Sequence, residues 1–253
     1  MTSPAWEIRP ARVIRSVGVI VPAHDEEDLL PLCLQSLRRA ARAVPGLPVH
    51  LVVVADACRD RTAAVARRGG AAVVTVDARN VGAARAAGAR EVLRRTGHLH
   101  PADVWLATTD ADTVVPPSWL GQQTRYADRG WDAVVGTIQV PDWSGYPPAV
   151  RSLFRERYTA GGSLHAHVHG ANLGFRASAY LAAGGFPDKP TAEDHALVAA
   201  LAAAGRRVLR TRRVTVVTSS RRQARAPLGF SGYLGDLEAE AEAETETARP
   251  ESA

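Results

Sequence analysis

The sequence predicts an α/β domain with a mostly parallel sheet that is covered by helices on both faces. The main observation is an alternation of short β-branched apolar runs with stretches that have helical apolar spacing. The chain has 253 residues, of which 46% are hydrophobic and 23% charged, so it can bury a full core and is neither disordered nor fibrous. Cys33 and Cys58 are too few for a disulfide scaffold or a four-thiolate metal site.

The first half of the chain shows the alternation most clearly. Residues 17–21 form a β-branched run that ends at Pro22, as a buried strand does, and helical spacing follows from Leu29 to Leu37. The pattern then predicts a strand at 49–55, a helix at 62–68, a strand at 71–76, a helix at 80–95 and a strand at 104–109. Ligands of such sheets bind beyond the carboxyl ends of the strands.

After Pro116 the alternation is looser. We expect a helix at 118–129, a strand at 133–140, a helix at 149–158, a helix at 193–204 and a last strand at 214–218. The Gly- and His-rich residues 161–185 are interpreted as loop, short strand and short helix.

The charges are unevenly distributed. From Asp236 onward there are seven acidic residues and one arginine, and the remainder of the chain is strongly basic. We therefore divide the chain into an extension at 1–15, one domain at 16–235 and an acidic disordered tail at 236–253. A basic body favours an anionic partner, and arginine-rich coding explains the surface arginines equally well.

Three expectations concern partners and compartment. The absence of a binding motif argues against nucleic acid. No apolar run reaches the ~18 residues of a spanning helix, and the N-terminus has no signal-peptide pattern, so we expect a cytoplasmic protein. A basic surface is also compatible with peripheral contact with a membrane.

Two carboxylates, Asp110 and Asp112, directly follow the strand at 104–109. At a strand end, carboxylates with this spacing can share one hard divalent cation, which would neutralise a diphosphate. The alternative is a pair of turn-forming aspartates. Asp56, which ends the second strand and begins no helix, is interpreted as functional. Gly82 and Gly88 indicate close approach of a backbone or ligand to the helix at 80–95, where Arg85 could reach a phosphate or base.

Asp194 has two interpretations. Thr191 and Asp194 have the spacing of a capping box, which would make Asp194 a structural cap. The functional interpretation is a general base at a helix N-terminus. The alternating His165, His167 and His169 could bind a metal, but ordinary polar loop residues are favoured. The arginines between 206 and 225 are interpreted as a solvated face.

Taken in order, six segments resemble family 2 glycosyltransferases of the GT-A fold, which use nucleotide-diphospho-sugar donors. The segments are 21–27, 53–62, 80–88, 110–112 with 116–120, 170–176 with 184–186, and 193–194. The resemblance covers residues 16 to about 220. It implies a Rossmann-like GT-A domain with a nucleotide-sugar-binding half at 16–115 and an acceptor-binding half at 116–235.

The sequence departs from this family in four places. Asp25 stands where asparagine is usual, and Ala55 replaces the first of two usual acids. The Gln/Arg-x-x-Arg-Trp motif of processive synthases is absent, and His195 is the last histidine, so the late metal-binding histidine of some relatives has no counterpart. A processive synthase is therefore not expected.

The resemblance also implies roles for individual residues. Those at the donor are Pro22, Ala23, His24, Glu26 and Asp56 around the nucleobase, Arg85 at the nucleotide, Asp110 at the ribose and the intervening Ala111. Asp112 would hold Mg²⁺ or Mn²⁺, and Asp194 would deprotonate the acceptor hydroxyl. Gly170, Asn172 and Glu193 would lie on the acceptor side.

The function implied is a metal-dependent, inverting, non-processive transfer of a sugar. The donor is a nucleotide-diphospho-sugar, and the acceptor is a hydroxyl on a small molecule, a glycan or a lipid-linked compound. Two alternatives remain open: a nucleotidyltransferase on a similar sheet, and a non-catalytic nucleotide-sugar-binding subunit.

Overall fold

The computed structural model describes residues 12–159, 165–222 and 230–247. The first part of the chain contains β1 (Ser16–Ala23), α1 (Leu30–Arg42), β2 (Val49–Asp56), α2 (Thr62–Arg68), β3 (Ala72–Val76), α3 (Val81–Arg95), η1 (Pro101–Asp103) and β4 (Val104–Thr108). The second part contains β5 (Thr113–Val114), α4 (Trp119–Asp128), β6 (Ala133–Gln139), α5 (Pro148–Thr159), η2 (Gly170–Asn172), β7 (Leu173–Arg176), α6 (Ala177–Ala182), α7 (Glu193–Ala203), β8 (Val208–Thr218) and α8 (Phe230–Thr247).

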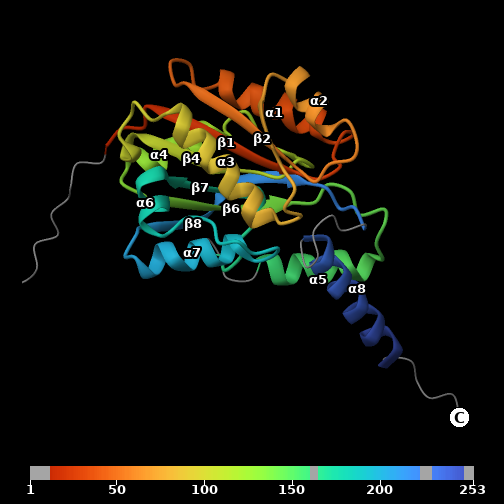
Figure 1. Cartoon of the computed structure of the whole chain (residues 1–253). Helices are drawn as coiled ribbons and strands as arrows, with labels where there is room; N and C mark the ends of the chain where they lie inside the picture. The colour runs from red at the N-terminus through yellow and green to blue at the C-terminus, as the bar shows by residue number, and fades with distance from the viewer. Residues whose placement is uncertain (1–11, 160–164, 223–229, 248–253) are drawn as a thin grey trace, which may run out of the picture.

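Within the described residues the strands form one eight-stranded sheet in the order β3-β2-β1-β4-β7-β6-β8-β5 (Figure 1). The four strands β1 to β4 are parallel, as the βαβ pattern predicts. β7 runs antiparallel to β4 and β6, whereas β8 runs parallel to β6. The predicted α/β class with a mostly parallel sheet is confirmed, and each antiparallel pair includes either β7 or β5.

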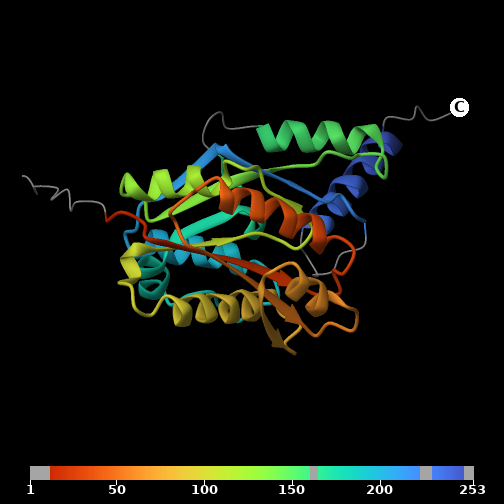
Figure 2. The same cartoon turned by 90° about the horizontal axis from the view of Figure 1, so that it is seen from above.

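Helices cover both faces of the sheet (Figure 2). Two apolar clusters result, one between the sheet and α1 and α4, the other between the sheet and α3 and α7. A Cβ at Gly88 would collide with Ile20 of β1, and one at Gly82 would collide with the carbonyl of Pro187. The close approach predicted for both glycines is confirmed, and it lets α3 lie directly on the sheet.

The topology gathers distant segments at one edge of the sheet. The carboxyl ends of β1, β2 and β4 lie together because these strands are parallel and in register. Since β7 is antiparallel to β4, the η2 turn that precedes it falls at the same edge. β6 and β8 run in the direction of β4, so the residues that follow Thr218 arrive there too.

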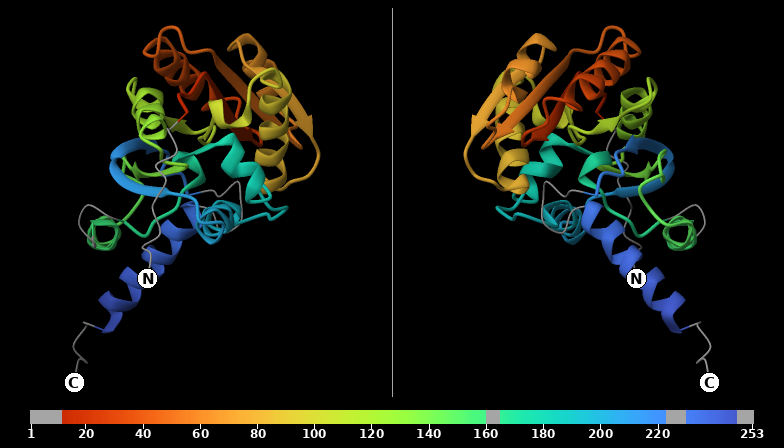
Figure 3. Two further views of the ribbon diagram at one scale, coloured as in Figure 1. Left: turned by 90° about the vertical axis from the view of Figure 1, so that its left-hand side faces the viewer. Right: turned by 90° about the vertical axis from the view of Figure 1, so that its right-hand side faces the viewer.

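The C-terminal segment differs from the sequence prediction. α8 is a helix that projects from the body of the molecule (Figure 3). Leu234, Leu237 and Ala241 are buried, and Glu238 and Glu240 form ion pairs with arginines. The prediction of a disordered tail at 236–253 is therefore wrong for residues 236–247, and 248–253 lie outside the described residues.

The tail prediction fails because an apolar helix face extends across the predicted domain boundary at residue 236. Phe230, Tyr233 and Leu234 precede Asp236 and pack near Phe154 of α5. This face docks α8, and the glutamates follow in the same helix. None of the helices in the described parts of the chain combines the length and apolarity that a bilayer crossing needs.

We predict that Leu237→Ala lowers the free energy of unfolding by about 2–5 kcal/mol, because it empties a site that is 0% exposed. Urea denaturation measures this change. The control is Leu181→Ala in α6, where the side chain is 50% exposed and a much smaller loss is expected. Equal effects of the two substitutions would show that α8 does not belong to the cooperative unit.

Candidate functional site

A cavity of about 840 Å³ opens at the carboxyl edge of the sheet. Its walls include nearly all of the residues to which the sequence analysis assigned roles: Pro22, Ala23, His24, Glu26, Asp56, Arg85, Asp110, Ala111, Asp112, Gly170, Glu193 and Asp194. Residues from both halves of the chain therefore share one pocket, of the size that small-molecule ligands occupy. Asn172 is the exception.

Asn172 is 0% exposed and serves the interior of the protein. Its Nδ2 donates to the carbonyls of Thr137 (2.7 Å) and Val214 (2.9 Å), and its Oδ1 accepts from Nε1 of Trp119 (2.9 Å). Together these bonds join η2, which contains Asn172, to β6, β8 and α4. The structure thus contradicts the acceptor-side position predicted for Asn172, because its amide is used to satisfy buried backbone groups.

Asp56 organises the loop that leads into α3. Its carboxylate accepts hydrogen bonds from the backbone N–H groups of Ala78 (2.7 Å), Arg79 (2.9 Å) and Asn80 (2.9 Å). Asn80 in turn caps α3 by accepting from the N–H of Ala83. The carboxylate shapes this wall of the cavity, and its contact with a nucleobase stays a prediction.

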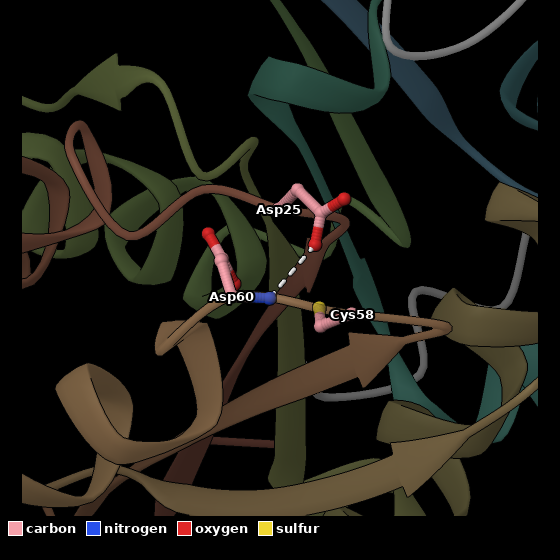
Figure 4. Close-up of side chains that lie close together, drawn as sticks. All are labelled: Asp25, Cys58 and Asp60. Carbon is pink, nitrogen blue, oxygen red and sulfur yellow. Dashed lines mark hydrogen bonds between the residues drawn. The ribbon is translucent and has the colours of Figure 1, made fainter.

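Asp25, Cys58 and Asp60 form a group of potential metal ligands beside the cavity, with ligand atoms within 4.8 Å of one another (Figure 4). Their chemistry argues against a metal. Asp25 accepts from the N–H of Arg59 at 2.6 Å, and Asp60 accepts from the N–H of Thr62 at 2.8 Å. Burial raises the pKa of the Cys58 thiol, so the thiolate that a metal needs is disfavoured. The group therefore links the loop after β1, which contains Asp25, to the loop after β2, which contains Cys58 and Asp60.

Arg85 lies beneath the cavity and is 4% exposed. Its Nε donates to Oγ1 of Thr108 at 3.1 Å, Nη2 to Oδ1 of Asp110 at 2.6 Å, and Nη1 to Glu193. Arg85 was expected to contact the nucleotide. In the structure its guanidinium connects α3, the end of β4 and the start of α7, and its contact with a nucleotide stays a prediction.

Gly170 connects this network to Asp194. A Cβ at Gly170 would collide with the guanidinium of Arg85, so glycine is required for the close approach. The N–H of Gly170 donates to Oδ2 of Asp194 at 2.6 Å. The capping box is not formed, since α7 begins after Ala192, whose φ is +56° and which makes no side-chain cap bond. Asp194 lines the cavity.

Asp112 lies in a cluster of acidic groups with one arginine. Nη2 of Arg221 is 3.1 Å from Oδ2 of Asp112 and 2.6 Å from Oε1 of Glu26. Burial, reinforced by the charge of Asp110, raises the pKa of Asp112 to about 6. Carboxylates from two loops therefore already converge on one cationic nitrogen, and hard oxygen ligands of this kind suit Mg²⁺ or Mn²⁺.

The far end of the cavity is formed by rings. His167 is stacked on Tyr158 at a centroid distance of 4.2 Å, and the edge of Phe230 faces His169. Burial lowers the pKa of His167 and of His169, in the latter to about 3, so both imidazoles are neutral. In the described residues the histidines belong to no group of three metal ligands.

The wall also contains residues to which sequence reasoning gave no role at the site, among them Arg221, Phe230 and Tyr233. Arg221 stands among many arginines, and the two rings lie in a segment assigned to the end of the domain. The available signal for Arg221 is that it closely follows the strand predicted at 214–218.

We predict that Arg85→Met lowers the free energy of unfolding by about 3–5 kcal/mol, because Glu193 is left as a buried unpaired charge. Adding Glu193→Gln should recover part of this loss, which denaturant titrations of the single and double variants measure. Arg94→Met, which breaks an exposed ion pair with Glu91, is the control and should have little effect. A double variant no more stable than Arg85→Met would contradict the pairing.

Comparison with known proteins places these features in context. The chain is 34% identical over 160 residues to the undecaprenyl-phosphate 4-deoxy-4-formamido-L-arabinose transferase of Pseudomonas paraeruginosa, covering 59% of this chain and 44% of that protein. The protein of the same name from Pectobacterium atrosepticum is 29% identical over 133 residues, which are 50% and 37% of the two chains. The match spans less than half the length of these relatives.

Solved structures support the fold. TarS 1–349 of S. aureus in complex with UDP-GlcNAc gives a TM-score of 0.59 at 14% identity, covering 92% of this chain and 73% of that one. The mannosyltransferase PcManGT of Pyrobaculum calidifontis in complex with GDP-Man and Mn²⁺ gives 0.55 at 20% identity, covering 95% and 77%. The sequence model of glycosyl transferase family 2 matches residues 18–182, well over half of the chain. The chain therefore belongs to glycosyl transferase family 2.

Proposed function

We propose that this protein transfers a sugar from a nucleotide-diphospho-sugar donor to an acceptor, with inversion at the anomeric carbon. The observation that carries the proposal is the shared cavity, whose lining includes Asp110, Asp112, the β1-end residues Pro22 to His24, and Asp194. A donor would lie across the carboxyl ends of β1, β2 and β4, which is where ligands bind in such sheets.

The donor half of the cavity is preformed. Pro22 and Ala23 end β1, His24 follows them, and Nδ1 of His24 is 2.7 Å from the carbonyl oxygen of Asp56. This bond fixes the imidazole against the neighbouring strand. In the proposal these residues surround the nucleobase, and Asp110 contacts the ribose. TarS and PcManGT are solved with UDP-GlcNAc and GDP-Man respectively, which supports the donor class.

A divalent cation fits the acidic end of this site. Asp112 would hold it, with Glu26 and Asp110 contributing negative charge within the same wall. When bound, the ion stabilises the charge of the diphosphate leaving group. The structure of PcManGT contains Mn²⁺, which favours Mg²⁺ or Mn²⁺ here.

Asp194 is the proposed general base. Its Oδ2 is held by the N–H of Gly170, and its Oδ1 accepts from the N–H of His195 at 2.7 Å. Two donors thus orient the carboxylate while it stays partly exposed to the cavity. In this position it would take the proton of an acceptor hydroxyl as the oxygen attacks the anomeric carbon in line with the departing diphosphate.

The acceptor has two chemical possibilities. A hydroxyl must lose its proton and needs the base. The names of the curated relatives give undecaprenyl phosphate as acceptor, and a phosphate oxygen attacks as an anion. The two classes differ in whether Asp194 is required.

We predict that Asp194→Asn slows transfer to a hydroxyl acceptor by about 10²- to 10⁴-fold, because the amide cannot accept a proton. Binding of donor and metal, measured by calorimetry, should stay near wild type. Near-normal transfer to a polyprenyl phosphate would instead indicate a phosphate acceptor.

We predict that Asp112→Asn removes the divalent-ion dependence of nucleoside-diphosphate binding, with little change in melting temperature. Titrating UDP and GDP with and without Mn²⁺ by calorimetry measures this dependence. Asp142→Asn, at an exposed loop position, is the control. Unchanged metal dependence in the variant would contradict the assignment of Asp112.

Product analysis separates the proposal from its alternatives. Incubation with a panel of nucleotide sugars and Mn²⁺ should release the nucleoside diphosphate by slow hydrolysis. Release of pyrophosphate from a sugar phosphate and a nucleoside triphosphate would indicate a nucleotidyltransferase, and binding without turnover would indicate a non-catalytic subunit.

A further inference from the structure

Arg221 is a positively charged residue in the wall of the cavity to which the proposed function gives no role. Its guanidinium forms a two-pronged contact with Glu26, at 2.9 Å from Nη1 and 2.6 Å from Nη2, and a third contact with Asp112 at 3.1 Å. The side chains of Glu26 and Asp112 are only 5% and 11% exposed, and that of Arg221 is 24% exposed. The most accessible member of the cluster is therefore the arginine.

The charges show why the arginine lies there. Six carboxylates line the cavity, and four of them, those of Glu26, Asp110, Asp112 and Glu193, pair with Arg85 or Arg221. Arg85 is committed to Glu193 and Asp110, so among the described residues it is Arg221 that compensates Glu26 and Asp112. Carboxylates this deeply buried are unfavourable without a cation close by.

We propose that Arg221 is the resident counterion of Asp112 and competes with the divalent ion for this carboxylate. The inference rests on the proposed function, because it concerns the proposed metal site. The Oδ2 atom that Arg221 contacts is an oxygen that a metal would use, and a guanidinium and a divalent ion repel each other at contact distance. Metal binding in the absence of donor is therefore weak.

The donor's diphosphate relieves this competition. A guanidinium binds phosphate oxygens through two parallel hydrogen bonds, so the diphosphate offers Arg221 a partner in place of Asp112. Asp112 is then free for the ion. Metal and nucleotide consequently bind cooperatively, and each raises the affinity of the protein for the other by the same factor.

The experiment measures Mn²⁺ affinity by electron paramagnetic resonance of the free ion. Wild type should bind Mn²⁺ alone weakly and more tightly in the presence of UDP or GDP. Arg221→Ala should bind Mn²⁺ alone at least about tenfold more tightly than wild type, since a nearby positive charge has been removed. The gain from nucleotide should be smaller in this variant. Adding Asp112→Asn to Arg221→Ala should abolish the tight Mn²⁺ site.

Two controls isolate the contact. Arg222→Ala removes the neighbouring arginine, which pairs with Glu238 and does not line the cavity, and should leave Mn²⁺ affinity unchanged. Arg221→Lys keeps the charge and should stay close to wild type. Circular dichroism checks the fold of each variant. The cooperativity between Mn²⁺ and nucleotide binding in the wild-type protein tests the inference without any substitution.

The outcomes are distinguishable. Equal Mn²⁺ affinity of wild type and Arg221→Ala, or a wild type that binds nucleotide without any gain in Mn²⁺ affinity, would overturn the role of Arg221. If no variant binds Mn²⁺ while nucleotides bind, the competition is overturned but donor binding survives. If Arg221→Ala binds Mn²⁺ more tightly and no nucleotide binds, the inference stands and the proposed donor function fails.

Discussion

The buried ion pair of Arg85 with Glu193 is the interaction on which the geometry of the cavity depends. Both side chains are 4% exposed, so neither charge can be left without the other. The pair joins α3 to α7, and the contacts of the same guanidinium with Thr108 and Asp110 add the end of β4. One side chain thus holds α7, which is distant in the sequence, in a fixed arrangement with α3 and the end of β4.

The position of Asp194 follows from this constraint. Asp194 succeeds Glu193 at the start of α7, and its carboxylate accepts from Gly170, which must be glycine because the Arg85 guanidinium occupies the place of a Cβ. The antiparallel strand β7 brings Gly170 to the edge where β4 ends. The proposed base and the proposed donor residues, which come from opposite halves of the chain, are therefore brought together by sheet direction and one buried cation.

The elements governed by local rules could be predicted from sequence, and those governed by tertiary partners could not. The bounds of α2 and the cap at Asn80 depend on spacing and side-chain chemistry within a few residues. Asn172 is polar and lies two residues after Gly170, but its role depends on carbonyls of β6 and β8, whose register is not encoded locally. The same holds for Arg221, which no motif distinguishes from Arg222.

The number of negative charges in the cavity explains why a diphosphate-binding site here would need a cation that can change partners. Arg85 is bound on several sides and cannot turn toward a ligand without exposing Glu193. A diphosphate adds negative charge to a wall in which burial and Asp110 already raise the pKa of Asp112. Binding such a donor therefore requires positive charge that the buried network cannot release. The exposed side of the cluster, where Arg221 lies, is the place at which that charge can be exchanged.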